Sequence, residues 1–592
     1  MKRTEISQEY KWKIEDLYAT NEIWEEDFAK LQKGIEELKN FEGTLGQSAE
    51  NLLKMQEKCD ELNQLAEKVY VYANQRLHED MGDTLYQGLS GRAQMLLVQM
   101  SEAASYIEPE ILAIPEEKLE EMMKKEGLRK YETYFRRLLR RKEHILSKEM
   151  EELLAGVDEV AEGPKDTFMM FNNADIKFPV IKGEDGEPVE ITHGRYVKLL
   201  ESQNRDVRKA AFEGLYGAYG KFKNTLAATY RANVKQAGFF AKARKYESSL
   251  KAALAGSHIP VEVYDSLIES VHAHLPALHE YVKVRKEKLG VEELHMYDLY
   301  VPMVGEADKK IPYEEAKEIV LNGLAPLGED YLELLKKGFN EGWIDVYENE
   351  GKRSGAYSWG AYGTHPYVLL NYQDNLNNVF TLAHEMGHAL HSYHSDETQD
   401  YIYAGYKIFV AEVASTCNEA LLIRYLLDHS KDDIEKAYLL NYFLEQFRST
   451  LFRQTMFAEF EKLAHAKSEA GETLTAETLC DMYYDLNKKY FGDEIVVDKE
   501  IALEWSRIPH FYTPFYVYQY STGFSAAIAI SSKILKGESG IVEKYKKFLS
   551  SGSSLDCIDL LKICDVDMTT KEPVEEALKV FENTLEEFAK II

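Results

Sequence analysis

The chain has 592 residues, of which 45% are hydrophobic, so it is long and apolar enough to be a globular protein with several lobes. Its 71 Lys and Arg residues against 101 Asp and Glu residues give a formal net charge of −30. Because this charge repels nucleic acids and anionic membrane surfaces, we exclude both as expected partners.

Cysteine usage and apolar content indicate the compartment. The five cysteines include no CxxC pair, which argues against a disulfide framework and against a cysteine-rich metal site. Residues 1–18 contain basic side chains with no apolar stretch behind them, and no run of about 18 apolar residues occurs in the sequence. We expect a soluble, cytoplasmic protein, and the sequence leaves its oligomeric state open.

Hydrophobic patterning predicts a mainly α fold class. Apolar residues at helical spacing predict helices over about 20–160. Residues 178–192 alternate apolar and polar side chains around Gly-rich turns, which predicts a small hairpin. A boundary near residue 190 divides the chain into an amino-terminal helical lobe, 1–190, and a second region, 191–592. That region is predicted to be helical except at 354–372, where Gly, aromatic and β-branched residues indicate two strands and a loop.

Directly after these strands, residues 384–388 read His-Glu-Met-Gly-His, an HExxH motif. On an α-helix, residues four apart differ by about 40° in direction and about 6 Å in height, so His384 and His388 can bind one metal ion. Glu385 then lies beside the metal-bound water and can accept its proton as a general base. Apolar residues flank the motif and favour a buried helix over a surface helix without a metal. We predict one zinc ion per chain.

A catalytic zinc ion needs a third protein ligand, and three residues are candidates. His394 stands where an HExxHxxGxxH motif has its third histidine. Because His391 replaces the glycine of that motif, the helix is expected to continue and to carry His394 about 9 Å along the axis from His388. His391 is better placed as a residue that supports a ligand or contacts the substrate. Glu412 is the ligand that we favour.

Glu412 lies in residues 408–427, which read as a second amphipathic helix. Glu412, Ser415 and Glu419 fall on one face of it, between apolar flanks. Two carboxylates among apolar residues favour a buried polar site over a solvated helix face. Glu412 is then the third ligand, and Glu419 accepts a hydrogen bond that orients an imidazole.

Residues 366–392 and 408–419 resemble the zinc region of the thimet-oligopeptidase family, specifically its oligoendopeptidase F branch. Three other segments are also similar to that branch, so the resemblance covers essentially the whole chain: 11–28, 204–230 and 241–254. It implies that the HExxH histidines and Glu412 bind zinc. The implied fold is a mostly helical, bilobed zincin with the metal deep in a substrate channel. A small β-sheet beside the HExxH helix would pair with the peptide backbone.

The resemblance also implies a His and Tyr cluster that stabilises the tetrahedral intermediate, and residues 508–527 match that segment. His510 is the expected histidine. Thr513-Pro514 has the form of an N-cap followed by a first helical residue, which would place Tyr516 and Tyr520 on one face. Tyrosine hydroxyls there can donate to a developing oxyanion.

The assignment among the tyrosines of this segment stays open, because packing in the core is the alternative for each of them. A helix that begins at Pro514 turns Tyr518 away from the other two, so we assign Tyr518 to packing. Catalysis is then predicted for Tyr516 and Tyr520, and Tyr512 remains a further candidate.

The resemblance implies a metalloendopeptidase that cleaves internal bonds of short unstructured oligopeptides, and the HExxH motif adds Glu385 as its expected general base. A dipeptidyl carboxypeptidase or a protein-processing metallopeptidase would share the zinc site. A peptide-binding protein with a relict site is the alternative from another class, and the intact set of His384, Glu385, His388 and Glu412 argues against it.

Overall fold

The computed structural model describes residues 1–305 and 310–592. The chain is mainly α-helical, as predicted, and it forms two compact units. The first unit consists of Met1–Glu143, Lys309–Tyr425 and Ile530–Asp565, and the second of His144–Asp308, Leu426–Ala529 and Val566–Ile592. The chain first passes between them at residues 143 and 144, and the predicted boundary near residue 190 stays a prediction.

The elements have the following bounds. The helices before residue 306 are α1 (Asn21–Leu38), α2 (Ala49–Glu79), α3 (Thr84–Ala104), α4 (Ile107–Ala113), α5 (Glu116–Met123), α6 (Glu132–Arg141), α7 (Lys148–Ala161), α8 (Gly163–Met170), α9 (His193–Leu200), α10 (Arg205–Gly220), α11 (Lys223–Ala243), α12 (Ser249–Ala255), α13 (Val261–Ala273) and α14 (Leu275–Leu289). The later helices are α15 (Tyr313–Gly323), α16 (Glu329–Asn340), α17 (Leu376–Thr398), α18 (Tyr401–Ala404), α19 (Ile408–Asp428), α20 (Asp433–Gln446), α21 (Arg453–Glu469), α22 (Ala476–Phe491), α23 (Tyr518–Leu535), α24 (Ile541–Leu549), α25 (Cys557–Lys562) and α26 (Glu572–Ile591). The strands are β1 (Val180–Lys182), β2 (Pro188–Glu190), β3 (Leu294–His295), β4 (Ile344–Asp345), β5 (Tyr357–Trp359), β6 (Tyr367–Leu369) and β7 (Ile495–Val496).

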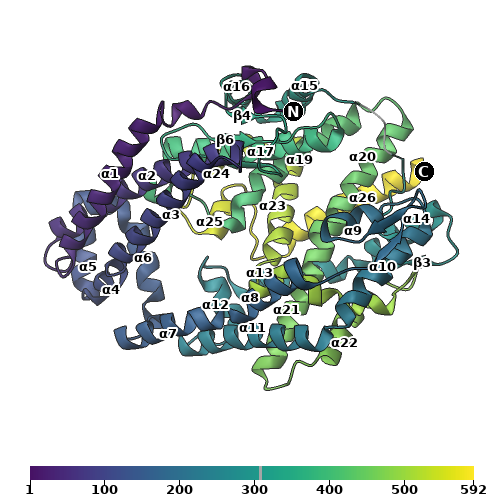
Figure 1. Ribbon diagram of the computed structural model, residues 1–592, viewed down its shortest axis with the longest axis horizontal. Coiled ribbons are helices and arrows are strands. Elements are labelled where there is room, and N and C mark those ends of the chain that lie inside the picture. The colour runs from purple at the N-terminus through teal and green to yellow at the C-terminus, as the bar shows by residue number, and fades with distance from the viewer. Residues whose placement is uncertain (306–309) are drawn as a thin grey trace. The chain divides into compact units, whose positions relative to one another are not determined.

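In the first unit, α1, α2 and α3 pack side by side (Figure 1). A three-stranded sheet has the order β4-β6-β5, with β4 parallel and β5 antiparallel to β6. The two strands expected within 354–372 are therefore confirmed as β5 and β6. Helix α17 packs against both of them and against α15, α16 and α24.

Helix α17 carries the HExxH motif, and its sequence explains where it begins. Asn375 caps it, because the side chain of Asn375 accepts a hydrogen bond from the backbone N–H of Asn378. Its apolar residues are buried at helical spacing, which anchors the helix in the core: Val379, Phe380, Leu382, Ala383, Met386, Ala389 and Leu390. The sequence thus places the motif on a rigid, buried element.

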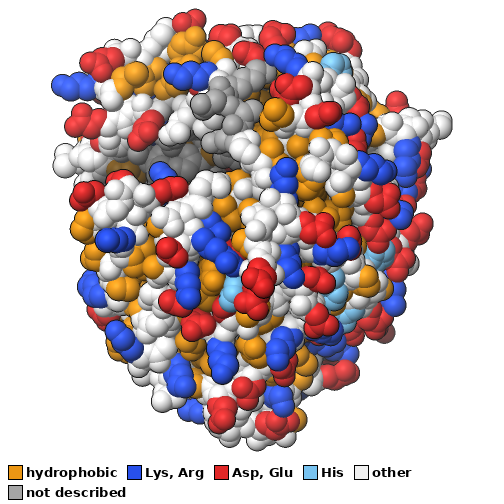
Figure 2. Space-filling view, turned by 90° about the vertical axis from the view of Figure 1, so that its right-hand side faces the viewer, with side chains coloured by type: hydrophobic (Ala, Val, Ile, Leu, Met, Phe, Trp, Pro, Cys, Tyr) orange, Lys and Arg blue, Asp and Glu red, His pale blue; other side chains and the backbone are white. Residues whose placement is uncertain are grey.

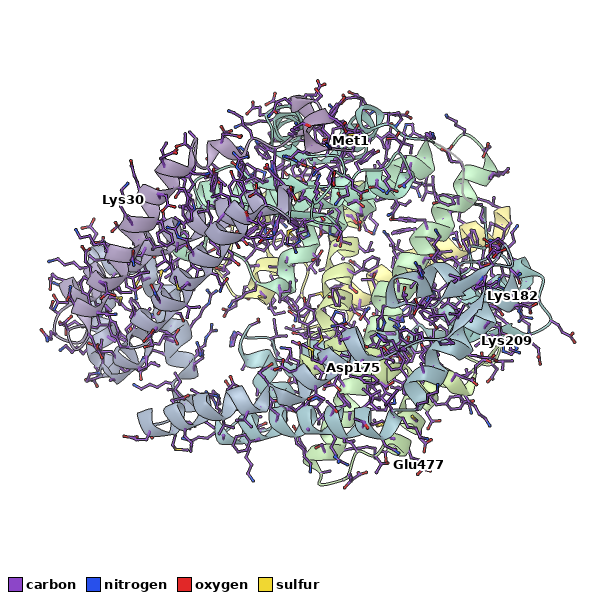
Figure 3. The ribbon with its side chains drawn as sticks, viewed as in Figure 1. Met1, Lys30, Asp175, Lys182, Lys209 and Glu477 are labelled. Atoms are coloured by element: carbon purple, nitrogen blue, oxygen red, sulfur yellow. The ribbon has the colours of Figure 1, made fainter. Side chains whose placement is uncertain are left out.

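In the second unit, the predicted hairpin is confirmed as the antiparallel pair of β1 and β2. It packs against α10, and Figure 3 marks Lys182 on the hairpin and Lys209 on that helix. On the face drawn in Figure 2, acidic and basic side chains are interspersed, so the excess of acidic residues does not form a single patch there.

Two further observations concern the apolar content of the helices and the state of the cysteines. Across residues 1–305 and 310–592, no helix is long and apolar enough to span a bilayer. The five cysteines are free thiols, and three of them are buried: Cys417, Cys557 and Cys564.

Candidate metal centre

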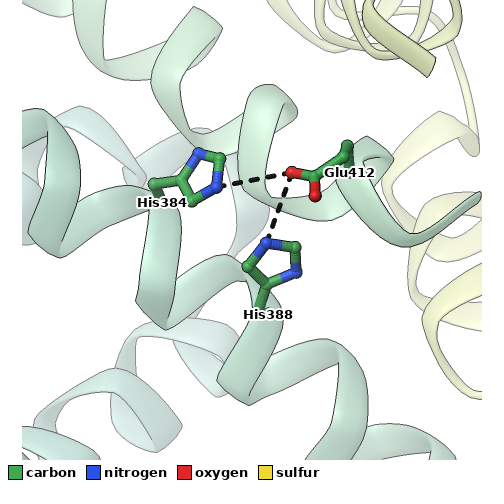
Figure 4. A group of neighbouring side chains, drawn as sticks. All are labelled: His384, His388 and Glu412. Atoms are coloured by element: carbon green, nitrogen blue, oxygen red, sulfur yellow. Dashed lines mark ion pairs between the residues drawn. The ribbon is translucent and has the colours of Figure 1, made fainter. Parts of the chain in front are cut away.

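The two histidines of the motif project from α17 toward Glu412 of α19 (Figure 4). Nε2 of His384 and Nε2 of His388 each lie 3.4 Å from Oε2 of Glu412. One ligand atom from each residue lies within 4.8 Å of the others, and within the described ranges this is the one group of His, Cys, Asp or Glu side chains that could hold a metal ion.

The spacing of these atoms fits zinc. Ligand atoms about 2.0–2.1 Å from a tetrahedral zinc ion are about 3.4 Å apart. The two nitrogen-to-oxygen distances of 3.4 Å match that separation. Two imidazole nitrogens and a carboxylate oxygen are also the donor types that zinc takes in catalytic sites with an open position. His384, His388 and Glu412 therefore fit a zinc ion in both chemistry and geometry.

Two residues of α19 support this group. Nδ1 of His384 lies 3.3 Å from Oε1 of Glu419, which is the contact that fixes the orientation of a metal-binding imidazole. The hydroxyl of Ser415 donates to Oε2 of Glu412 over 3.1 Å. The face of α19 with Glu412, Ser415 and Glu419 thus faces α17.

The electrostatics follow from burial and from these contacts. Burial alone would raise the pKa of Glu412, but hydrogen bonds from His384 and His388 outweigh it and hold that pKa far below its usual range. Burial alone would lower the pKa of His384, yet Glu412 and Glu419 hold it well above the ordinary value. The carboxylate is therefore ionised and positioned to bind a cation between itself and the imidazoles.

Glu385 has a different environment from Glu412. Its side chain is 7% exposed. Burial raises its pKa, and the neighbouring Glu412 adds to this, while His384 and His388 oppose it. A carboxylate with a raised pKa binds a proton more readily, which suits a general base.

Two residues that the sequence analysis missed bring α19 against α17. A Cβ atom on Gly387 would lie 2.6 Å from Cα of Ser415 and 2.8 Å from the carbonyl oxygen of Ala414, so only glycine permits this approach. The side-chain amide of Asn418 donates to the carbonyl of Ala383 over 3.0 Å and ties the helices together. A glycine between the two histidines of the motif, where helix propensity disfavours it, was a usable signal.

We expect Gly387→Ala to weaken zinc binding more than it destabilises the fold. The added methyl group must displace the backbone of α19 at Ser415, and this shift moves Glu412 away from the histidines. Zinc content after dialysis against a chelator, measured alongside thermal unfolding, tests this. Gly405→Ala is a matched control, because a Cβ there meets no atom within 4 Å. Full zinc retention in Gly387→Ala would contradict the argument.

The alternative ligands lie elsewhere on α17. The helix continues without a turn to Thr398, as expected, and His394 is not part of the metal-binding group. The ring of His394 lies 6.5 Å from that of Tyr331. His391 is 1% exposed and stacks on Tyr406 at a centroid distance of 3.8 Å.

In the second unit, His510, Tyr516 and Tyr520 form one aromatic cluster. The ring of His510 lies 6.1 Å from that of Tyr516 and 5.9 Å from that of Tyr520, and the two tyrosine rings are 5.6 Å apart. Nε2 of His510 is 3.5 Å from the hydroxyl of Tyr520. Burial, and then the charge of Arg453, lower the pKa of His510, so its imidazole is neutral near pH 7.

The predicted helix start at Pro514 is wrong, since α23 begins at Tyr518 and the preceding residues form a turn. Phe515 has φ of +58°, a left-handed conformation that interrupts a helix. Tyr518 nevertheless packs in the core, 3% exposed and 5.0 Å from the ring of Tyr264. Tyr512 is also buried and stacks on Phe168 at 4.3 Å. Tyr516 and Tyr520 thus remain as the pair beside His510.

Comparison with known proteins agrees with this arrangement. Residues 198–580 match the model of peptidase family M3, and residues 110–178 match the oligopeptidase F model. Oligopeptidase PepF of Bacillus subtilis (strain 168) is 49% identical over 591 residues, which span 100% of this chain and 88% of that relative. Group B oligopeptidase PepB of Streptococcus agalactiae is 41% identical over 591 residues, with 100% and 98% covered. The crystal structure of oligoendopeptidase-F from Enterococcus faecium superposes with a TM-score of 0.76 at 41% identity, over 96% of this chain and 99% of that one.

The mostly helical fold with an HExxH helix beside a small sheet defines a peptidase of the oligopeptidase type. The chain belongs to peptidase family M3, in the group of oligoendopeptidase F.

Proposed function

We propose that the protein is a zinc-dependent endopeptidase that hydrolyses internal bonds of short, unstructured oligopeptides. The convergence of His384, His388 and Glu412 at the separation that a tetrahedral zinc ion requires carries the proposal. Membership of peptidase family M3 and the oligopeptidase names of the relatives support the reaction and the substrate class.

Glu385 is the proposed general base. A zinc ion held by His384, His388 and Glu412 would supply a Lewis acid that makes water more acidic and polarises a peptide carbonyl. Glu385 accepts the proton of the attacking water at its carboxylate and passes it to the leaving amine. Its burial raises its affinity for the proton.

His510, Tyr516 and Tyr520 are proposed to donate hydrogen bonds to the oxyanion of the tetrahedral intermediate. A tyrosine carries a phenolic O–H, so it can donate a hydrogen bond to an oxyanion. Their mutual packing in the second unit fixes the rings. The buried Tyr512 and Tyr518 are assigned to the core.

Product analysis on a mixed peptide library tests the proposed function. Mass spectrometry is expected to find fragments from internal cleavage of peptides and no cleavage of folded proteins. A chelator should abolish the reaction and added Zn²⁺ should restore it. Release of carboxy-terminal dipeptides alone would instead indicate a dipeptidyl carboxypeptidase, and peptide binding without cleavage would indicate a relict site. The cytoplasmic location expected from the sequence stays a prediction.

We expect Tyr520→Phe to lower kcat by about 100-fold while changing KM little, because a donor to the oxyanion acts mainly in the transition state. Tyr516→Phe should show the same pattern. Tyr518→Phe is the matched control, since its side chain is buried in the core and it should keep kcat per folded molecule. Steady-state kinetics on one fluorogenic peptide compares the three variants. The largest loss of kcat in Tyr518→Phe would overturn the assignment.

A further inference from the structure

A cavity of about 680 Å³ lies in the first unit beside the metal-binding helix. It is lined by residues of α2, of β5, of α18 and of the carboxyl-terminal half of α17. Its volume falls within the range of about 300–1,000 Å³ that is typical of ligand sites. The proposed reaction uses none of its lining residues.

The cavity continues from the metal-binding face of α17. Ser392 and Asp396 line it, and they follow His388 by four and eight residues on the same helix. With a rise of 1.5 Å per residue, they lie about 6 Å and 12 Å further along the axis. An extended peptide advances about 3.4 Å per residue. The cavity is thus placed for a side chain about two to four residues from the scissile bond.

The backbone of β5 borders this cavity through Ser358 and Trp359. Strand β5 is an edge strand, because it pairs with β6 alone in the sheet order β4-β6-β5. Tyr357 and Trp359 lie opposite Leu369 and Tyr367 of β6, while Val368 of β6 donates its N–H to Trp343 on the side of β4. Ser358 lies opposite Val368, whose N–H points away from β5, so the two residues form a pair without hydrogen bonds between them. In an antiparallel ladder, the N–H and C=O of Ser358 then point away from β6, where an added strand could bind them.

The charge of the cavity is negative. Its lining residues include four carboxylates and no Lys, Arg or His: Asp60, Glu67, Glu108 and Asp396. Lys130 lies 3.8 Å from Asp60, and Arg141 lies 3.6 Å from Glu108, so two of the four have a cation nearby.

Asp396 and Glu67 have no such cation. Among the described residues, Asp396 has no hydrogen-bond or ion-pair partner, and Glu67 accepts a hydrogen bond from the backbone N–H of Tyr362 over 3.3 Å. Burial, and then the charges of Glu67 and Glu397, raise the pKa of Asp396 to about 7. Burial likewise raises the pKa of Glu67. A bound cation would relieve this unfavourable arrangement of charge.

Two further features point to a peptide residue as the occupant. Gln56 is 4% exposed and lines the cavity, and its amide nitrogen makes no regular hydrogen bond within the described part of the chain, although the Gln56 side chain interacts with the hydroxyl of Tyr134. A buried donor of this kind suits a carbonyl of a bound peptide. Trp359, Tyr362 and Tyr401 supply aromatic walls, over which a guanidinium group stacks favourably. The carboxylates are not close enough together to form a metal-binding group, so an organic cation fits better than a metal ion.

We propose that this cavity is a specificity subsite for an arginine side chain, or less favourably a lysine side chain, of the peptide substrate, with Asp396 as its principal anionic contact. The proposal rests on the proposed peptidase function. Pairing of the substrate backbone with β5 would accept many peptide sequences. The subsite would add a preference for peptides with a basic residue at one position.

The test compares fluorogenic peptides that carry either arginine or citrulline at one position, moved stepwise from four residues before to four residues after the scissile bond. Citrulline keeps the shape of arginine and removes its charge. At one position, two to four residues from the cleaved bond, kcat/KM is expected to be about 10- to 100-fold higher for arginine, as for a hydrogen bond to a charged group.

The ratio of kcat/KM for arginine over citrulline should fall at least fivefold in Asp396→Asn. Glu333→Gln is the matched control: its side chain is exposed on α16 and does not line the cavity, so the ratio should stay unchanged. Equal kcat/KM for both peptides at every position, or the same ratio in Asp396→Asn as in wild type, would overturn the subsite. Each peptide is also compared with a free and with an acetylated amino terminus. If the cavity instead selects the positively charged free amino terminus, the subsite for an arginine side chain would also be overturned. Failure of the enzyme to cleave either peptide would instead count against the proposed function.

Discussion

Replacing Glu385 with Gln is expected to lower kcat by about 1,000-fold or more while the protein keeps its zinc. A general base contributes about 10²- to 10⁴-fold, and Glu385 is proposed both to take the proton from water and to give it to the leaving amine. The amide of Gln has nearly the same shape, but it cannot accept that proton. The three proposed ligands are untouched, so metal affinity should stay near that of the wild type.

Three measurements on Glu385→Gln separate chemistry from structure. These are kcat on a fluorogenic peptide, zinc content by atomic spectroscopy and the midpoint of thermal unfolding. Glu397→Gln makes the same chemical change at an exposed position of α17, and it should keep kcat. A Glu385→Gln protein that retains a tenth of wild-type kcat would exclude Glu385 as the base. Loss of zinc together with activity would show that the side chain serves the metal site instead.

Elements whose determinants are local were predictable from the sequence. The amphipathic pattern that predicted α17 depends on residues three and four positions apart, and the Asn375 cap acts within one turn. The hairpin of β1 and β2 closes over five residues, 183–187. Such features need no knowledge of the rest of the chain, because periodicity and turn residues act over a few positions.

Features that depend on distant partners were missed. Strand β4 contains two residues, and it is defined by pairing with β6 more than twenty residues later. The start of α23 depends on the turn at Phe515, whose backbone N–H donates to the buried carboxylate of Glu461 on α21 over 2.9 Å. The capping pattern at Thr513 and Pro514 predicted a helix at this point, and the tertiary contact overrode it.

The candidate site also combines a feature that depends on local sequence with a feature that depends on a distant contact. The i, i+4 spacing of His384 and His388 was sufficient to predict that both imidazoles project from the same side of the helix. Whether Glu412 joins them depends on how closely α19 approaches α17, which the small size of Gly387 permits and Asn418 secures. No periodicity within either helix encodes that distance, so Glu412 could be favoured from sequence but not placed beside the histidines.

We expect Glu412→Ala to lose zinc almost completely under conditions in which the wild-type protein retains it. Removal of a supporting partner typically costs about 10- to 100-fold in metal affinity, and loss of a ligand should cost more. The variant also loses the negative charge that lies 3.4 Å from both imidazoles, so nothing offsets the charge of the cation. Competition with a series of chelators of increasing affinity measures the dissociation constant.

The zinc affinity of Glu412→Ala is compared with that of two matched variants. Glu419→Ala removes the carboxylate on Nδ1 of His384, so it should fall in the 10- to 100-fold range of a supporting partner. His394→Ala should bind zinc as the wild type does, because His394 lies outside the ligand group. We therefore expect the zinc dissociation constant to be largest for Glu412→Ala, smaller for Glu419→Ala and smallest for His394→Ala. Zinc loss in His394→Ala with retention in Glu412→Ala would reverse the assignment of the third ligand, since the two residues cannot both complete a site that leaves one position open to water.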